Sequence, residues 1–311
     1  MISLLDLAKK SENPVKPFGH TDVLLLYGMV GDKLRGFLHG KEIASKVWLP
    51  KGNIKYFLNR GSKKPPLYVD DLVEAITPEF LEIRSEHHLK EVETEITEKQ
   101  KLVWLYFPPR KLADFFYATN SEGAGKPIDR IFFDIDRGEG VSFEHAREVA
   151  KLLCETIRKD SELRKLIGKT KPFVSWTGNS FHVYIMLSEL KPNSFYERYF
   201  MFSKNDPLAS FTGRWAEEIK NELKINVSGG HEKIPNHISI DPSQTPSGKL
   251  CRSPLGSLHM ADAKTIDGVS VPLTEEMLGD NNLEEKLKEI TPAYVIKNLE
   301  KLAERLPRMP S

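Results

Sequence analysis

The sequence has few of the features that mark secreted or membrane proteins. Its 311 residues include only two cysteines, Cys154 and Cys251, too few for a disulfide framework or a four-cysteine zinc site. The longest apolar run, residues 23–30, is far shorter than the roughly 20 residues that a membrane-spanning helix needs. Residues 1–10 lack the positive charge, apolar stretch and small residues of a secretory leader. We therefore expect a cytoplasmic protein that does not bind membranes.

The sequence also lacks a strong net charge, because 45 basic residues nearly balance 44 acidic ones. This balance argues against non-specific coating of nucleic acid but permits a local basic groove. Residues 51–64 are a candidate, with five basic residues, no acidic residue and two aromatic side chains. Such a segment can grip phosphates and stack bases. The alternative is a solvated surface with Tyr56, Phe57 and Leu58 in the core.

Residues 1–115 show little periodicity, although the 40% apolar content of the chain is enough for a sizeable core. The length suits one or two domains. In this region we expect strands at 22–30, 47–49 and 82–83, a helix at 70–76, and a turn leading into a helix at 108–116.

From residue 128 the pattern becomes regular. It predicts strands at 130–136, 172–176, 181–187 and 237–241, and helices at 142–159 and 208–223. Ser142 is the expected N-cap of the first helix. The order βαββαβ is that of the split-βαβ, ferredoxin-like unit, in which the first strand lies beside the third and the fourth.

The C-terminal region contains a strand candidate at 269–273 and helical segments at 285–290 and 292–306, the latter with Thr291 as N-cap. Residues 307–311 have the composition of a linker, so we expect a longer protein. We predict an α+β fold with three parts: an N-terminal α/β lobe at 1–115, a core with the ferredoxin/RRM-like βαββαβ sheet at 116–275, and C-terminal helices with a linker at 276–311.

Three carboxylates and a histidine share one predicted face of this sheet. Side chains alternate along a strand, and the parity of the strands places together Asp134, Asp136, His182 and Asp241. Clustered carboxylates repel one another, and a divalent cation relieves that repulsion. Oxygen ligands with open positions suit Mg²⁺ or Mn²⁺. Two such ions can clamp an in-line phosphoryl transfer.

A triphosphate substrate would also need hydrogen-bond donors. The candidate nucleotide-binding residues are Asn179, Ser180, His182, Lys249, Arg252, Ser257 and His259. Arginine is well suited because its planar fork matches phosphate oxygens. Each residue also has a simpler interpretation: His182 as a half-buried core histidine, Asp241 as part of a strand-ending turn before Pro242, and Arg252 and His259 as solvated loop residues. Their joint order favours a functional site.

The ordered motifs resemble those of the archaeo-eukaryotic primase superfamily. The three motifs are Phe133-Asp134-Ile135-Asp136, the turn from Thr177 to His182, and Ile240-Asp241. Downstream, Arg252-Ser253-Pro254 and Ser257-Leu258-His259 resemble the small catalytic subunits. The resemblance spans roughly residues 105–275, and a linker-like end is similar to the primase-polymerases of archaeal plasmids.

This resemblance implies a DNA primase or DNA-directed polymerase. Asp134, Asp136 and Asp241 would hold two Mg²⁺ or Mn²⁺ ions, with no zinc or iron–sulfur cluster in this chain. Ser180, His182, Arg252 and His259 would contact the triphosphate of an incoming NTP or dNTP. The primer 3′-hydroxyl would attack the α-phosphate and release pyrophosphate. The implied partners are a single-stranded DNA template, a primer strand, and a further domain or helicase- or large-subunit-like region beyond residue 311.

The chain departs from the family pattern at Thr177 and Ser180, where serine and glycine are usual, and by one extra residue between Arg252 and His259. Three other functions remain open. The chain could be a non-catalytic, RRM-like nucleic-acid-binding module on a related sheet, a metal-dependent phosphoesterase, or a repair polymerase of the end-joining type.

Overall fold

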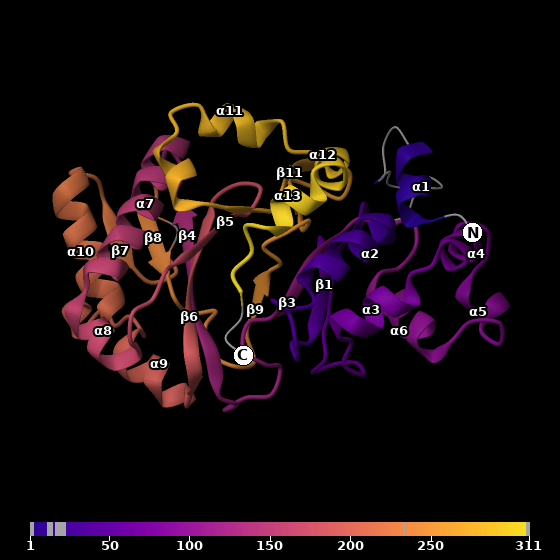
Figure 1. The fold of residues 1–311 in the computed structure, drawn as a ribbon, viewed down its shortest axis with the longest axis horizontal. Coiled ribbons are helices and arrows are strands. Elements are labelled where there is room, and N and C mark those ends of the chain that lie inside the picture. The colour runs from indigo at the N-terminus through magenta and orange to yellow at the C-terminus, as the bar shows by residue number, and fades with distance from the viewer. Residues whose placement is uncertain (1–2, 11–14, 16–22, 233, 309–311) are drawn as a thin grey trace. The chain divides into compact units, whose positions relative to one another are not determined.

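The computed structural model describes residues 3–10, 15, 23–232 and 234–308. The chain forms two compact units (Figure 1), each built from segments that are far apart in sequence. The first unit contains Met1–Ala118, Leu250–Val271 and Glu289–Leu306; the second contains Thr119–Lys249, Pro272–Lys288 and Pro307–Ser311. Within the described residues, no helix has the length and apolarity needed to cross a bilayer.

A six-stranded sheet with the order β12-β5-β6-β4-β8-β7 forms the centre of the second unit. Its strands are β4 (Ile128–Arg137), β5 (Phe173–Trp176), β6 (Phe181–Lys191), β7 (Val227–Gly229), β8 (Ile238–Asp241) and β12 (Val271–Leu273). Strand β4 pairs antiparallel with both β6 and β8, and β5 pairs antiparallel with β6. The first strand of the predicted βαββαβ order thus lies between the third and the fourth, as expected.

Two long helices cover one face of this sheet, as Figure 1 shows. They are α7 (Phe143–Lys159) and α10 (Phe211–Leu223). Phe143 of α7 packs on Phe181, and Trp215 of α10 packs on Phe133. The predicted N-cap is confirmed, because Ser142 Oγ accepts a hydrogen bond of 3.2 Å from the His145 amide. Shorter helices complete the unit: α8 (Ser161–Ile167), α9 (Asn193–Tyr199), α11 (Leu283–Lys288) and the 3₁₀ turns η1 (Pro207–Ala209) and η2 (Glu275–Gly279).

The opposite face, which carries the predicted site residues, is covered along part of its length. Phe132, His182 and Tyr184 pack against one another there, with ring centroids 4.7 and 5.1 Å from Phe132. All three side chains are buried. The sequence shows which side chains share a face, but it does not show what covers them.

A four-stranded antiparallel sheet with the order β2-β1-β3-β9 forms the centre of the first unit. Its strands are β1 (Ile43–Trp48), β2 (Tyr56–Asn59), β3 (Ala113–Ala118) and β9 (Leu250–Arg252). Strands β10 (Leu258–Met260) and β11 (Ile266–Val269) form a separate pair. The helices are α1 (Leu4–Lys10), α2 (Val23–Leu34), α3 (Val69–Ala75), α4 (Pro78–Glu86), α5 (Leu89–Val92), α6 (Glu98–Tyr106), α12 (Pro292–Lys297) and α13 (Leu299–Ala303).

Several predictions for the first unit are wrong. The strand expected at 22–30 is helix α2, and Asp22 lies outside the described residues. A continuous apolar run fits a buried helix as well as a strand. Helix α2 packs closely against the end of α3 at Gly28, because a Cβ at this position would lie only 2.8 Å from the Ile76 side chain.

Two further segments of the first unit also differ from expectation. Residues 82–83 lie inside helix α4, which begins after Thr77; Thr77 Oγ1 accepts a 3.2 Å hydrogen bond from the Phe80 amide. Residues 113–116, expected to begin a helix, belong to strand β3. The strand near Val47 and the helix at 70–76 are confirmed as β1 and α3.

The C-terminal helices follow the sequence signals closely. Thr291 caps α12 by accepting a 3.1 Å hydrogen bond from the Tyr294 amide. The predicted helix at 292–306 is interrupted at Asn298, where α12 ends and α13 begins. The strand expected at 269–273 is divided at Ser270 between β11 and β12. Of the linker-like segment 307–311, residues 309–311 lie outside the described part of the chain.

Candidate functional site

Three of the predicted site residues occupy adjacent positions on neighbouring strands of the second unit. Asp134 on β4 lies opposite His182 on β6 and opposite Asp241 on β8. Residues paired in this way have Cα atoms about 4.5–5.5 Å apart. Asp136 lies two residues further along β4, on the same face, opposite Ser239. The strand register therefore brings together residues from three motifs that are far apart in sequence.

These four side chains differ in their access to solvent. Asp134 and Asp136 are half-buried, whereas His182 and Asp241 are buried, with 6% and 5% of their surface exposed. The Nε2 atom of His182 lies 3.5 Å from Asp134 Oδ1. The β4 carboxylates are therefore the accessible part of the group, and His182 contacts Asp134 from the neighbouring strand.

Asp241 also takes part in a turn at the end of β8. Its Oδ1 accepts a 2.8 Å hydrogen bond from the Ser243 amide, and its Oδ2 accepts a 2.9 Å bond from the Ser243 hydroxyl. Each carboxylate oxygen keeps a second lone pair, so these bonds leave acceptor capacity. Burial, and then the charge of Asp241, raises the pKa of the nearby Tyr196 hydroxyl.

The carboxylates of Asp134, Asp136 and Asp241 are ligands of the kind that a hard divalent cation prefers, but their side chains are not arranged around one metal position. Carboxylate oxygens with solvent access are the ligands that Mg²⁺ and Mn²⁺ prefer. Across residues 3–10, 15, 23–232 and 234–308, no group of three or more His, Cys, Asp or Glu side chains is arranged to hold a metal ion. The structure thus shows neighbouring carboxylates in register, and the assignment of metal ligands stays a prediction.

The turn between β5 and β6 is closed by Thr177. Its hydroxyl accepts hydrogen bonds from the amides of Asn179 and Ser180, at 3.3 and 2.9 Å, and its own amide donates to the Ser180 carbonyl. Gly178 has φ +98°, a conformation that favours glycine. The Ser180 hydroxyl donates to the Ile135 carbonyl of β4. The Asn179 and Ser180 amides are thus used by the turn itself, while the Asn179 side chain is exposed.

Sequence reasoning missed Arg137, which connects β4 to this turn. Arg137 Nη2 donates to the backbone carbonyl of Asn179 at 2.6 Å and to its side-chain Oδ1 at 2.8 Å. The only sequence signal was its position directly after Asp136. Burial lowers the pKa of the Arg137 guanidinium from its usual value, and the charge of Glu284 raises it.

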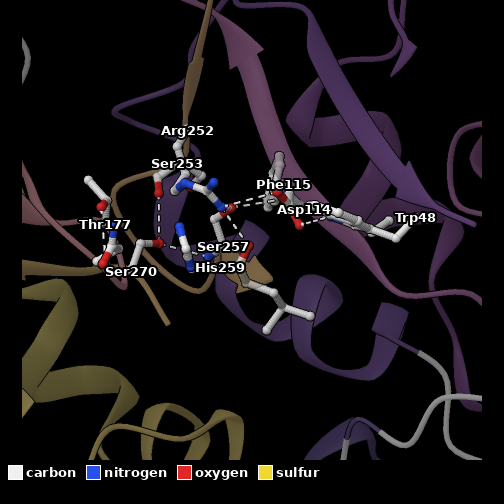
Figure 2. Close-up of polar contacts among 12 residues, drawn as sticks. Trp48, Asp114, Phe115, Thr177, Arg252, Ser253, Ser257, His259 and Ser270 are labelled. Carbon is white, nitrogen blue, oxygen red and sulfur yellow. Dashed lines mark hydrogen bonds and ion pairs between the residues drawn. The ribbon is translucent and has the colours of Figure 1, made fainter. Parts of the chain in front are cut away.

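Arg252, Ser257 and His259 belong to the first unit, whereas the other predicted site residues belong to the second. Figure 2 shows the Arg252 guanidinium pointing toward Asp114 and Ser257. Arg252 Nη1 lies 3.4 Å from Asp114 Oδ2 and 3.4 Å from Ser257 Oγ, and it donates to the Leu258 carbonyl. The guanidinium also lies over the Phe116 ring. The Arg252 guanidinium therefore already contacts side chains of β3 and the segment that follows β9.

Asp114, on β3, is a second residue that the sequence did not reveal. Its side chain is fully buried, and Oδ1 accepts a 2.9 Å hydrogen bond from Trp48 Nε1. Burial raises the pKa of the Asp114 carboxyl, while the positive charges of Arg252 and Lys46 act in the opposite direction. A single aspartate in a segment without clear periodicity gives no sequence signal for this pairing.

The other residues near β9 that were predicted to contact the nucleotide differ in their surroundings. Ser257 is buried; its hydroxyl accepts a 3.1 Å hydrogen bond from the Phe115 amide, and its amide donates to Ser270 Oγ at 2.8 Å. His259 is half-buried, with Nδ1 2.6 Å from Asp267 Oδ1. Lys249, in the second unit, is exposed. Contact of any of these residues with a nucleotide stays a prediction.

Comparison with known proteins shows a likeness in fold to a solved structure. No protein-family model and no curated protein matches the sequence. A solved structure, the polymerase domain from Mycobacterium tuberculosis ligase D in complex with DNA, is similar with a TM-score of 0.54 and 18% sequence identity. The similarity covers 93% of this chain and 94% of that chain, so it includes the segments of both compact units. The chain therefore shares its fold with this polymerase domain, and its sequence motifs resemble those of the archaeo-eukaryotic primase superfamily.

Proposed function

We propose that this protein is a nucleotidyltransferase that extends a primer on a DNA template from nucleoside triphosphates and releases pyrophosphate. The observation that carries the proposal is the register of β4, which places Asp134 opposite both His182 and Asp241. The likeness in fold to a polymerase domain supports the same reaction class. Placing the carboxylates of Asp134 and Asp241 side by side does not stabilise the fold, because bringing like charges together costs free energy. The arrangement therefore indicates a function.

In this proposal Asp134, Asp136 and Asp241 would hold two Mg²⁺ or Mn²⁺ ions. When bound, such ions would neutralise the charge that develops on the phosphoryl oxygens. His182, 3.5 Å from Asp134, orients that carboxylate from the neighbouring strand. Ser243 fixes the carboxylate of Asp241 in the same way. The contribution of the chain is thus mainly positioning and charge placement.

For the triphosphate we keep the predicted contacts of Asn179, His182, Lys249, Arg252 and His259. The hydroxyls of Ser180 and Ser257 are buried and bonded to backbone groups. We infer that these two serines shape the loops around the site and do not contact the nucleotide directly.

Primer extension tests the proposal directly. A labelled primer annealed to a longer template, incubated with dNTPs or NTPs and Mg²⁺ or Mn²⁺, should lengthen with time, and chelation of the metal should stop the reaction. Shortening of the primer would instead identify a phosphoesterase. Metal-independent RNA binding without any reaction would identify a binding module.

A repair polymerase of the end-joining type is the second candidate, because the similar solved structure is the polymerase domain of a ligase. Substrate design separates the two roles. Faster filling of a short gap with a 5′-phosphate than extension of an open template favours repair. De novo synthesis on a template without primer favours priming.

We infer that the β1–β2 hairpin contacts the DNA. Ile54, Tyr56 and Phe57 are exposed by 65%, 42% and 38%, so the alternative that Tyr56 and Phe57 pack in the core is wrong. Lys46 Nζ lies 4.5 Å from the Trp48 ring centroid and 4.2 Å from that of Tyr56. Exposed aromatic rings beside lysines bind single strands by stacking and phosphate contact.

Reversing two charges at this hairpin should weaken DNA binding. In the double variant Lys51→Glu/Lys55→Glu we expect roughly tenfold weaker binding of a single-stranded oligonucleotide, with the slope of log K against log salt reduced by about 1.4 because about 0.7 is lost per phosphate contact. Fluorescence anisotropy at several salt concentrations measures both. The matched control is Lys165→Glu/Lys169→Glu, which reverses two exposed lysines of the second unit. An equal loss in both variants would show only a general charge effect.

A further inference from the structure

We propose that Arg137 is a positioning residue that fixes the side-chain amide of Asn179, so that its NH₂ group faces the incoming triphosphate. This inference rests on the proposed nucleotidyl transfer and deepens it. It assigns a role to a residue that lies on β4 immediately after Asp136, the second β4 carboxylate.

The contacts of Arg137 define the orientation of the Asn179 amide. One guanidinium nitrogen, Nη2, donates to both the backbone carbonyl and the side-chain Oδ1 of Asn179, at 2.6 and 2.8 Å. A guanidinium can only donate hydrogen bonds, so the amide atom that meets it must be the oxygen. The usual ambiguity between the oxygen and nitrogen of an asparagine amide is thereby removed.

The two donors of the Asn179 amide then face away from Arg137. Asn179 is exposed, so these donors are available to a ligand. A triphosphate offers acceptors only, and an NH₂ group is a suitable partner for its oxygens. The backbone amides of Asn179 and Ser180 do not compete for this role, since Thr177 Oγ1 already accepts from both.

Arg137 is held well enough to act as a fixed support. Its Nε is buried and has no hydrogen-bond partner among the described residues, so that end of the guanidinium lies against packed atoms. Arginine stays protonated at neutral pH even when burial lowers its pKa. Because side chains alternate along β4, Arg137 projects from the face opposite to Asp136.

One strand thus supports both halves of the proposed site. Asp134 and Asp136 are carried on one face of β4, and Arg137 on the other face restrains the turn that ends at Ser180. The Ser180 hydroxyl adds a second tie between the turn and β4, through the Ile135 carbonyl. The turn that carries Asn179 is therefore tied by hydrogen bonds to the strand that carries the two carboxylates.

Steady-state extension kinetics with dNTP as the varied substrate test this role. For Arg137→Ala we expect the KM for dNTP to rise roughly tenfold while kcat changes less than about threefold, since loss of binding shared by the ground and transition states raises KM alone. Arg137→Lys should recover part of the loss, because an ammonium can donate hydrogen bonds to the same oxygens but is carried on a flexible stem and not on a pre-organised planar guanidinium. Asn179→Ala should show the same rise in KM.

A double-variant cycle gives the sharpest readout. If Arg137 acts through Asn179, Arg137→Ala/Asn179→Ala should be no worse than either single variant. Arg198→Ala, an exposed arginine of α9, is the control and should behave as wild type. Urea unfolding of each variant checks that the fold is retained.

The outcomes separate the two levels of the proposal. If wild-type protein neither extends a primer nor quenches or enhances the fluorescence of mant-dATP on mixing, the proposed function fails. If wild-type protein is active and Arg137→Ala leaves KM unchanged, or if the two single losses add, only the positioning role is overturned. A fall in kcat without a rise in KM would also overturn it.

Discussion

Replacing Asp134 with alanine should reduce nucleotide incorporation by roughly 10³-fold, which corresponds to about 4 kcal/mol of transition-state stabilisation. Asp134 is the central residue of the candidate site, because it is the one that lies opposite both His182 and Asp241. Its removal takes away a proposed metal ligand and leaves His182 without the carboxylate 3.5 Å from its Nε2 atom. Single-turnover primer extension with Mg²⁺ and with Mn²⁺ measures the effect.

Two control variants make this result specific. Asp206→Ala removes an exposed carboxylate of the same unit and should leave the rate unchanged. Asp134→Asn keeps the shape of the side chain but not its charge, and it should be nearly as inactive as the alanine variant. Because Asp134 is half-buried and not part of the packed core, thermal unfolding should change little. Near-normal incorporation by Asp134→Ala would refute the site assignment.

Replacing Arg252 with alanine should lower the free energy of unfolding by about 2–3 kcal/mol. The cause is the buried Asp114 carboxyl, which would lose the guanidinium 3.4 Å away, its strongest electrostatic compensation, and keep weaker ones such as Lys46 and the Trp48 hydrogen bond. Urea titration of the wild type and of the variant measures the difference. Arg252 is also a predicted nucleotide contact, so a loss of activity in this variant has two possible causes.

The dependence of stability on pH separates these causes. Burial already raises the pKa of Asp114, and loss of Arg252 should raise it further. The folded state then binds a proton more tightly than the unfolded state, whose aspartate has a pKa of about 3.9. Between these two pKa values the folded state holds more protons, so stability falls as pH rises. Arg252→Ala should therefore lose stability more steeply with rising pH than the wild type.

Removing the carboxyl charge provides the matched control for this prediction. In Asp114→Asn/Arg252→Ala the buried group is neutral, so most of the lost stability and the added pH dependence should disappear. Activity that stays low in this double variant, despite restored stability, would support a direct role of Arg252 at the nucleotide. An unchanged urea midpoint in Arg252→Ala alone would show that the buried pair is not important for the fold.

The second unit could be predicted largely from the sequence because its signals are local. The strand ending in Asp136 alternates regularly, Ser142 caps a helix with a strong apolar face, and the turn after Trp176 contains a glycine. The βαββαβ order then fixes which strands are neighbours. That order, together with the alternation of side chains along the strands, predicts that Asp134 and Asp241 share one face, as the register confirms. Metal coordination by these carboxylates stays a prediction.

The first unit was harder to predict because its stabilising contacts are distant in sequence. Asp114 pairs with a residue 138 positions further along, and neither residue of that pair leaves a local pattern. In the second unit, the contact of Arg137 with a turn 42 positions away was missed for the same reason. The apolar run that forms α2 was misassigned because it lacks polar positions that would reveal a helical period.

Strand β9 pairs along β3 and completes the sheet of the first unit, although it lies far from β3 in sequence. A shortened protein ending before Leu250 would therefore present the backbone N–H and C=O groups of β3 unpaired, beside the buried rings of Phe115 and Tyr117. Exposed apolar edges of this kind recruit other chains and lead to aggregation. Deletion mapping of activity by C-terminal truncation would thus report loss of solubility and not loss of a functional segment.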